Sequence, residues 1–170
     1  MEQVRALHPG WEIVFFSDGD CREFVANQTP HFLELYDYMP KPDMRADLFR
    51  LLVEHLLGGF YLDTDVWLNR PLDKAAELTC VFPWEREMNR AEYDRKSPKR
   101  NRGAVRPLQV GNYAFGSAEK HPFLRGILKE LVSRTANWDA SAVKDDTVLY
   151  ATGPDLLTSV KYHSFAADPS

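Results

Sequence analysis

Two pairs of aspartates in this sequence have the Asp-x-Asp spacing that can hold a divalent cation: Asp18 with Asp20, and Asp63 with Asp65. A Mg²⁺ or Mn²⁺ ion needs only one or two carboxylates from the protein when water and phosphate oxygens complete its coordination. The spacing alone is a weak signal, because a chain of 170 residues with 14 aspartates contains such a triplet by chance. The surroundings of each pair must therefore decide between them.

The surroundings favour the second pair. Residues 18–20 read as a turn, where Asp and Gly are common for backbone reasons alone, so we assign them no metal. Asp63 and Asp65 follow a short apolar strand predicted at 60–62, and in extended backbone residues i and i+2 project to the same side. Both carboxylates could then converge on one cation, although a turn at the strand end with two solvated acids fits the spacing equally well.

A second group of polar residues lies on the helix that precedes this strand. Asp47, Arg50 and Glu54 are spaced i, i+3 and i+7, which places them on one face. One interpretation is an exposed face with a salt bridge of little energetic value. The other is a cleft that this face shares with the Asp63 pair, because the helix runs directly into the strand through Gly58. An Asp and an Arg together suit sugar hydroxyls, which both donate and accept hydrogen bonds.

The elements that position these residues alternate between strand and helix, which indicates an α/β fold in one domain, residues 1–170. Helical periodicity predicts helices over 43–57, which follows Pro42 and ends at Gly58-Gly59, and over 122–132; Thr152-Gly153-Pro154 opens a third. Apolar runs predict a buried parallel strand over 11–16 and short strands over 60–62, 79–82 and 113–115. The acidic clusters fall at strand ends, where open α/β sheets bind ligands.

Composition excludes several classes of protein. The chain is 44% hydrophobic and 27% charged, which is typical of a folded globular domain, and its net charge of −4 argues against a nucleic-acid partner. No apolar run reaches the length of a transmembrane helix, and no targeting segment is readable.

Cys21 and Cys80 match no metal or redox spacing; we expect two unpaired thiols, and a single disulfide is the alternative. Residues 85–106 hold eight basic and four acidic residues and predict a mobile basic loop, which is either simply solvated or binds an anionic partner.

The residues around the second aspartate pair resemble the sugar-binding DXD region of glycosyltransferase family 32. The resemblance rests on Arg45-Ala46-Asp47-Leu48-Phe49-Arg50 followed by Leu57-Gly58-Gly59-Phe60-Tyr61-Leu62-Asp63-Thr64-Asp65-Val66. Weaker matches follow in the family's order, at Gly111-Asn112, at His121-Pro122 and at Thr152-Gly153-Pro154. Together they cover most of the chain, from about residue 11 to 160.

The resemblance implies a GT-A-like, Rossmann-like fold, with a mixed, mostly parallel sheet flanked by helices. It also implies a retaining, metal-dependent transfer of a hexose from a nucleotide-sugar donor to a glycan or glycolipid acceptor, with mannose as the first guess and galactose or glucose next. Asp65 would ligate Mn²⁺ or Mg²⁺ directly, and Asp63 would contact ribose or a metal-bound water. Asp47 and Arg50 would hold the donor sugar, and Tyr61 and Asn112 would line the donor pocket.

The sequence differs from the family pattern at both ends. The family's usual first strand is absent before Met1, and the His and Ser-Trp elements that follow the Thr-Gly-Pro helix are missing, so residues that contact the nucleotide base and a third metal ligand are not assigned. The alternative function is a catalytically weak or inactive carbohydrate-binding relative. A phosphatase of the haloacid dehalogenase type is disfavoured, because Trp67 stands where Thr or Val is usual. Localisation is left open: the resemblance implies the Golgi for a typical eukaryotic member and the cytoplasm for a bacterial or viral one.

Overall fold

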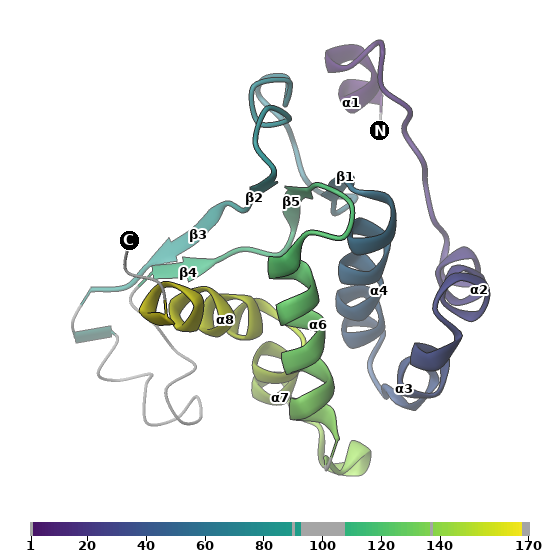
Figure 1. The fold of residues 1–170 in the computed structure, drawn as a ribbon, viewed down its shortest axis with the longest axis vertical. Helices are drawn as coiled ribbons and strands as arrows, with labels where there is room; N and C mark the ends of the chain where they lie inside the picture. The colour runs from purple at the N-terminus through teal and green to yellow at the C-terminus, as the bar shows by residue number, and fades with distance from the viewer. Residues whose placement is uncertain (1, 90, 93–107, 137, 168–170) are drawn as a thin grey trace.

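The structure is a computed structural model that describes residues 2–89, 91–92, 108–136 and 138–167. The chain combines helices with two small sheets, so it is mixed α/β, as predicted (Figure 1). The strands are β1 (Gly59–Leu62), β2 (Cys80–Val81), β3 (Trp84–Glu87), β4 (Leu108–Val110) and β5 (Ala114–Ser117). The main helices are α1 (Glu2–Leu7), α2 (Asp18–Gln28), α3 (Leu33–Tyr38), α4 (Pro42–Leu57), α6 (Pro122–Thr135), α7 (Asp145–Ala151) and α8 (Pro154–Ala167), with short 3₁₀ turns at Pro30–Phe32 and Ala140–Ala142.

The pairing of the described strands differs from the predicted, mostly parallel sheet. One sheet has the order β1-β5-β2, and the other pairs β3 with β4; each of these ladders is antiparallel. The predicted parallel strand over 11–16 is wrong, because this segment forms no ladder with any described strand. Phe16 packs against Phe24 and Phe49, and Trp11 packs against Phe60, whereas Val14 and Phe15 are each 58% exposed. Apolar residues alone do not make a strand when no neighbouring strand accepts their hydrogen bonds.

The helix α4 is the central element, and the sequence predicted it closely. Pro42 occupies its first turn, and apolar residues along it, such as Met44 and Leu48, are fully buried. It ends at Gly58, whose φ of 67° lies in the left-handed region. A Cβ at this position would lie 2.8 Å from the backbone nitrogen of Glu119, so only glycine allows the helix end to approach this loop closely. The chain then enters β1 directly.

The prediction that Asp18 and Asp20 lie in a turn between elements is wrong. These residues form the first turn of α2, where Ser17 is the N-cap and the Asp20 carboxylate accepts a hydrogen bond from the Ser17 backbone at 2.8 Å. This is a capping box, which explains the acidic residue at position 20. Asp20 therefore has a local structural role at the start of α2.

The C-terminal helices build the other side of the core. The predicted helix over 122–132 is confirmed as α6, and its apolar face is buried, including Leu124 and Ile127. The predicted third helix is confirmed as α8, which begins at Pro154. It packs on β4, where the Val110 backbone N–H donates to Thr158 Oγ1 at 2.9 Å. This contact ties the end of β4 to α8.

The predicted loop over 85–106 is wrong in its first part, because β3 covers Trp84–Glu87 and pairs with β4. Residues 90 and 93–107, which carry most of its basic side chains, lie outside the described residues. Cys21 and Cys80 are both free and half-buried, as expected. Within the described part of the chain, no helix is both long and apolar enough to cross a lipid bilayer.

Candidate functional site

The carboxylate of Asp47 is buried and hydrogen-bonded on both of its oxygens. Only 6% of the residue is exposed, although the sequence allowed a solvated helix face here. The Asn112 side-chain amide donates to Oδ1 at 2.8 Å, and the Thr152 hydroxyl donates to Oδ2 at 2.8 Å. These partners come from the β4–β5 connection and from the end of α7, so three distant segments meet at one carboxylate.

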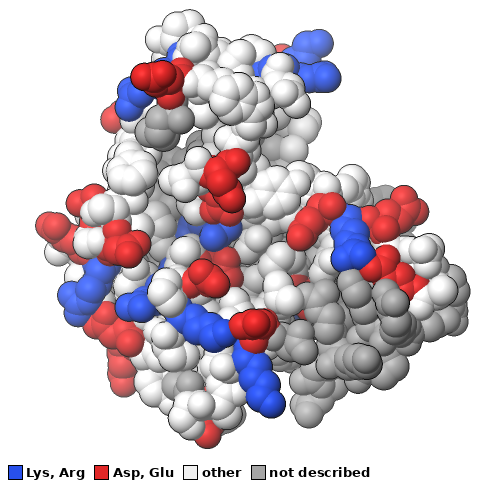
Figure 2. All heavy atoms as spheres, turned by 180° about the vertical axis from the view of Figure 1, so that it is seen from behind, with Lys and Arg blue, Asp and Glu red and all other residues white. Residues whose placement is uncertain are grey.

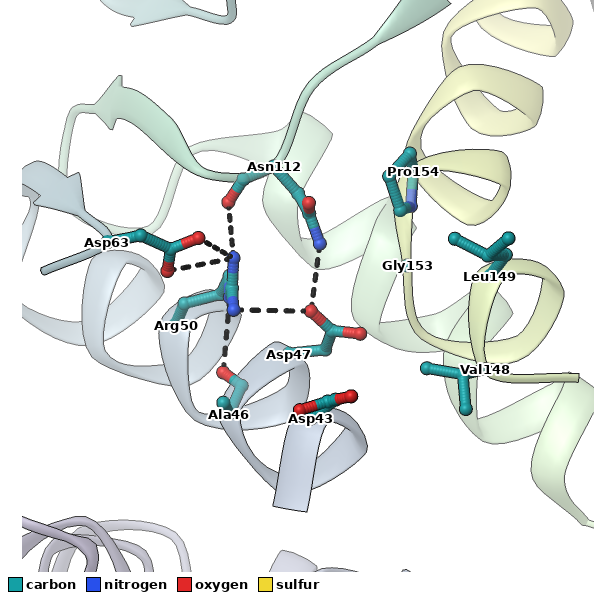
Figure 3. Close-up of a pocket in the computed structure, with 10 residues that line it drawn as sticks. All are labelled: Asp43, Ala46, Asp47, Arg50, Asp63, Asn112, Val148, Leu149, Gly153 and Pro154. Atoms are coloured by element: carbon teal, nitrogen blue, oxygen red, sulfur yellow. Dashed lines mark hydrogen bonds and ion pairs between the residues drawn. The ribbon is translucent and has the colours of Figure 1, made fainter. Parts of the chain in front are cut away.

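Arg50 connects this carboxylate to the Asp-x-Asp segment. Its Nη2 lies 3.4 Å from Asp47 Oδ1, and its Nη1 lies 3.3 Å from both Asp63 oxygens (Figure 3). Nη1 also donates to the backbone carbonyl of Asn112 at 2.7 Å. The guanidinium is 7% exposed and satisfied mainly by these groups, so its charge offsets that of two buried or half-buried carboxylates. The helix face and the end of β1 therefore meet at Arg50 and Asp63, as predicted for part of these residues.

Tyr61 supports Asp63 from within β1. Its hydroxyl donates to Asp63 Oδ1 at 2.7 Å, and the Arg50 guanidinium lies 4.8 Å from the centre of its ring. Burial raises the pKa of the Tyr61 phenol, and the hydrogen bond to Asp63 raises it further, so the hydroxyl stays a donor at neutral pH. Tyr61 does not itself line the pocket described below.

Asp65 occupies a different environment from Asp63. The strand β1 ends at Leu62, and residues 63–66 form a turn closed by a hydrogen bond from the Val66 N–H to the Asp63 carbonyl at 3.0 Å. The expected extended geometry, with both carboxylates on one side of a strand, is thus not observed. Asp65 is exposed and has no hydrogen-bond or ion-pair partner among the described residues. Asp63 is committed to the buried network, whereas Asp65 is available to a ligand.

A pocket of about 330 Å³ opens beside this network and has two chemically different walls. Figure 3 shows the polar wall on α4 and the β4–β5 connection, and the apolar wall at the corner between α7 and α8. The polar wall includes Asp47, Arg50, Asp63 and Asn112, four of the six predicted site residues; the full lining is Asp43, Ala46, Asp47, Arg50, Asp63, Asn112, Val148, Leu149, Gly153 and Pro154. Tyr61 and Asp65 are outside this lining. Its volume falls in the range of small-molecule sites.

The lining carries three carboxylates and one guanidinium, so the pocket is acidic when all of them are ionised. Burial raises the pKa of Asp47 to about 6, against the opposing effects of the Arg50 charge and the Thr152 hydrogen bond; the nearby carboxylates Asp63 and Asp43 raise it further. Asp47 is therefore mostly ionised at neutral pH and protonates in mild acid. Over the face shown in Figure 2, acidic and basic side chains are mixed, without a large region of one sign.

Glu54, the third member of the predicted polar face, does not line the pocket. Its side chain is 4% exposed, accepts a hydrogen bond from the backbone of Ser117, and has one oxygen, Oε2, that is buried without a partner among the described residues. Burial raises the pKa of Glu54 to about 8. Glu54 is thus a neutral acid in the folded protein at pH 7, separate from the site.

Several residues at the pocket were not predicted as site residues: the lining residues Asp43, Ala46, Val148, Leu149, Gly153 and Pro154, and Thr152, which bonds Asp47 from outside the lining. Thr152 belongs to the Thr-Gly-Pro segment that carries part of the family resemblance, so the sequence held evidence that this residue lies near the site. Val148 and Leu149 belong to no motif that marks them as site residues. No cluster of three or more His, Cys, Asp or Glu side chains arranged for a metal ion occurs within the described ranges.

Comparison with known proteins finds a family model that matches the N-terminal part of this site. Residues 1–82 match the family described as a glycosyltransferase sugar-binding region containing a DXD motif. These residues include Asp47, Arg50 and the Asp63 pair, and end before Asn112 and Thr152. Together with the relatives below, this match supports the resemblance to glycosyltransferase family 32 that the sequence predicted.

The similar curated proteins are named as mannosyltransferases or related synthases. An inositol phosphoceramide mannosyltransferase of Schizosaccharomyces pombe is 32% identical over 91% of this chain and 37% of its own length. A mannosyl phosphorylinositol ceramide synthase of Saccharomyces cerevisiae is 29% identical over 91% of this chain and 34% of its own length. An initiation-specific alpha-1,6-mannosyltransferase of S. pombe is 23% identical over 91% and 41%. The chain spans well under half the length of these relatives.

Proposed function

We propose that this chain is the donor-binding region of a retaining hexosyltransferase with a GT-A fold, which moves a hexose from a nucleoside-diphosphate sugar to a glycan or glycolipid acceptor. The observation that carries the proposal is the buried network of Asp47, Arg50 and Asp63, oriented by Asn112 and open to a two-walled pocket. Mannose is the first sugar to test, because the similar curated proteins bear mannosyltransferase names. Their glycolipid names favour a glycolipid acceptor.

The two walls of the pocket suit a hexose. A sugar ring presents hydroxyls at its edge and C–H groups on its faces, so it needs hydrogen-bonding groups on one side and apolar contact on the other. Asp47 and Asn112 supply acceptors and donors on the polar wall, and Val148 and Leu149 supply an apolar surface opposite them. Because these groups are held by protein hydrogen bonds before the ligand arrives, they need little reorganisation to bind it.

The acidic lining also explains why a donor diphosphate would need a cation. Phosphates would be repelled by the carboxylates of this pocket unless a positive charge lay between them. Asp65 fits the role of a direct ligand to Mn²⁺ or Mg²⁺, because its carboxylate is exposed and has no partner among the described residues. Asp63, which is held by Arg50 and Tyr61, fits a contact with the donor's ribose. A bound cation would stabilise the negative charge that develops on the leaving diphosphate.

Asp47 and Arg50 would orient the sugar during the transfer. Positive charge develops at the anomeric carbon as its bond to phosphate breaks, and a fixed carboxylate nearby stabilises that charge electrostatically. The ion pair with Arg50 and the hydrogen bonds from Asn112 and Thr152 hold the Asp47 carboxylate in place for this role. We assign no enzymic nucleophile.

Isothermal titration of the chain with GDP-mannose, with and without Mn²⁺, tests the proposal. We expect binding that depends on Mn²⁺, slow donor hydrolysis, and loss of both in Asp47→Asn. The matched control is Asp37→Asn, an exposed aspartate paired with Arg22 away from the pocket, which should bind like the wild type. UDP-galactose and UDP-glucose complete the donor panel. Binding without hydrolysis would support an inactive carbohydrate-binding relative, and no binding of any nucleotide-sugar would refute the proposal.

A further inference from the structure

Thr152 connects the C-terminal end of α7 to the buried carboxylate of Asp47. The residue is fully buried, and its Oγ1 lies 2.8 Å from Asp47 Oδ2 and 3.2 Å from the Val148 carbonyl. A hydroxyl carries one proton and donates to one of these acceptors at a time. The shorter contact is to the carboxylate, and hydrogen bonds to a charged acceptor are the stronger ones.

The two oxygens of Asp47 are held by different segments of the chain. Oδ1 accepts from Asn112 and pairs with Arg50, which lie on the polar wall. Oδ2 accepts from Thr152, its partner among the described residues, on the side of α7. A carboxylate bound at only one oxygen can still turn about its terminal torsion, whereas one bound at both has a single orientation.

We propose that Thr152 is a positioning residue, whose hydroxyl fixes the orientation of the Asp47 carboxylate in which it accepts a hydrogen bond from the donor sugar. This inference rests on the proposed function for the sugar contact. The position of Thr152 behind Asp47, outside the pocket lining, means that it acts through Asp47 and does not touch the ligand.

The backbone around Thr152 leaves it little freedom to move away. A Cβ on Gly153 would lie 3.1 Å from the Leu149 Cα, so the corner between α7 and α8 is closely packed. This corner also supplies the apolar wall through Val148, Leu149 and Pro154. The hydrogen bond from Thr152 therefore joins the two walls of the pocket, and it should set the distance between them as well as the direction of the carboxylate.

A purely local role is the competing explanation. Threonine hydroxyls often bond the carbonyl four residues earlier in a helix, and such a bond would only shape the end of α7. Thr135 makes only local contacts of this kind: it is buried in α6, its hydroxyl lies 2.9 Å from the Leu131 carbonyl and 3.3 Å from the Val132 carbonyl, and it does not line the pocket. Thr135→Val is thus a matched control for Thr152→Val.

The experiment compares Thr152→Val, Thr152→Ser and Thr135→Val with the wild type by titration with GDP-mannose and Mn²⁺ and by the kinetics of donor hydrolysis. Loss of a buried hydrogen bond to a charged group should raise the Kd about 10-fold or more in Thr152→Val. Serine keeps the hydroxyl and should restore binding to within about twofold, and Thr135→Val should bind like the wild type. If Thr152→Val binds as tightly as the wild type, the proposal is overturned. If the valine variant does not fold, Thr152→Ala is measured in its place.

A crystal structure of Thr152→Val separates this inference from the proposed function. We expect the Asp47 carboxylate to have turned away from its wild-type orientation, with Thr152→Ser unchanged. If the wild type binds no nucleotide-sugar, the proposed function fails, but a turned carboxylate would still support the positioning role of Thr152. An Asp47 side chain that keeps its orientation in the valine variant would refute that role whatever the binding result.

Discussion

Replacing Glu54 by glutamine should stabilise the protein, and more so as the pH rises. Glu54 is 4% exposed, and its Oε2 has no partner among the described residues. Burial raises the pKa of this acid to about 8 from an ordinary value of 4.5. The folded protein therefore keeps the proton at neutral pH, whereas the unfolded chain releases it.

The sign and size of the effect follow from this difference. Since the folded state binds one proton more than the unfolded state between about pH 4.5 and 8, the free energy of unfolding falls as the pH rises through this interval. At about 1.36 kcal/mol per pH unit, the loss is roughly 3 kcal/mol at pH 7 and approaches roughly 5 kcal/mol above pH 8. Glutamine has nearly the shape of the protonated acid and does not ionise, so Glu54→Gln should avoid this loss.

Urea unfolding of the wild type and Glu54→Gln at pH 5, 7 and 8.5 measures the effect. The two proteins should be similar at pH 5 and differ by several kcal/mol at pH 8.5. Glu23→Gln, an exposed glutamate on α2, is the control and should show no difference that grows with pH. A difference between the wild type and Glu54→Gln that stays constant from pH 5 to 8.5 would refute the reasoning.

Three further predictions concern the site and the end of α4. Asp65→Ala should abolish turnover but leave the melting temperature nearly unchanged, because this side chain is exposed. Asp18→Ala should have nearly normal activity in the same assay. The reverse result would mean that the metal is held by the pair at 18 and 20 and not by the pair at 63 and 65. Donor binding measured by titration should weaken as the pH falls through about 6, because Asp47 protonates there and a neutral acid is a poorer acceptor; equal affinity at pH 5 and 7 would contradict this. Gly58→Ala should destabilise the fold by roughly 1–3 kcal/mol in thermal unfolding, because of its φ of 67° and the close approach of Glu119.

The helix α4 was predictable because all of its determinants are local. Pro42 at its start, apolar residues at helical spacing and a glycine stop lie within one stretch of sequence, and the structure has the helix within one residue of the predicted bounds. The strands at 60–62, 79–82 and 113–115 were found for the same reason, each within a few residues. The pairing of these strands was not predicted, because a ladder depends on residues that are distant in sequence.

The site shows the same division between local and distant determinants. The spacing of Asp47 and Arg50 placed them on one helix face, but it did not tell an exposed face from a buried one. Burial depends on Asn112 and Thr152, which reach Asp47 from 65 and 105 residues away. The turn after β1 likewise forms where the strand loses its partner: the Asp63 N–H still donates to the Tyr113 carbonyl at 2.8 Å, and beyond it the chain turns.

The buried charges of the network are costly for a purely structural role. Apolar side chains of similar volume would fill the space around Asp47 and Arg50 without any loss of hydration, and a buried ion pair often contributes no more stability than they would. Yet Asp47, Arg50 and Asp63 all face an open pocket, each already oriented by neighbouring groups. Because the pocket keeps an excess of carboxylates over cations, a bound divalent cation and a bound diphosphate would each remove the charge that opposes the other. Donor and metal should therefore bind cooperatively, and titration of either ligand alone should give much weaker affinity than titration in the presence of its partner.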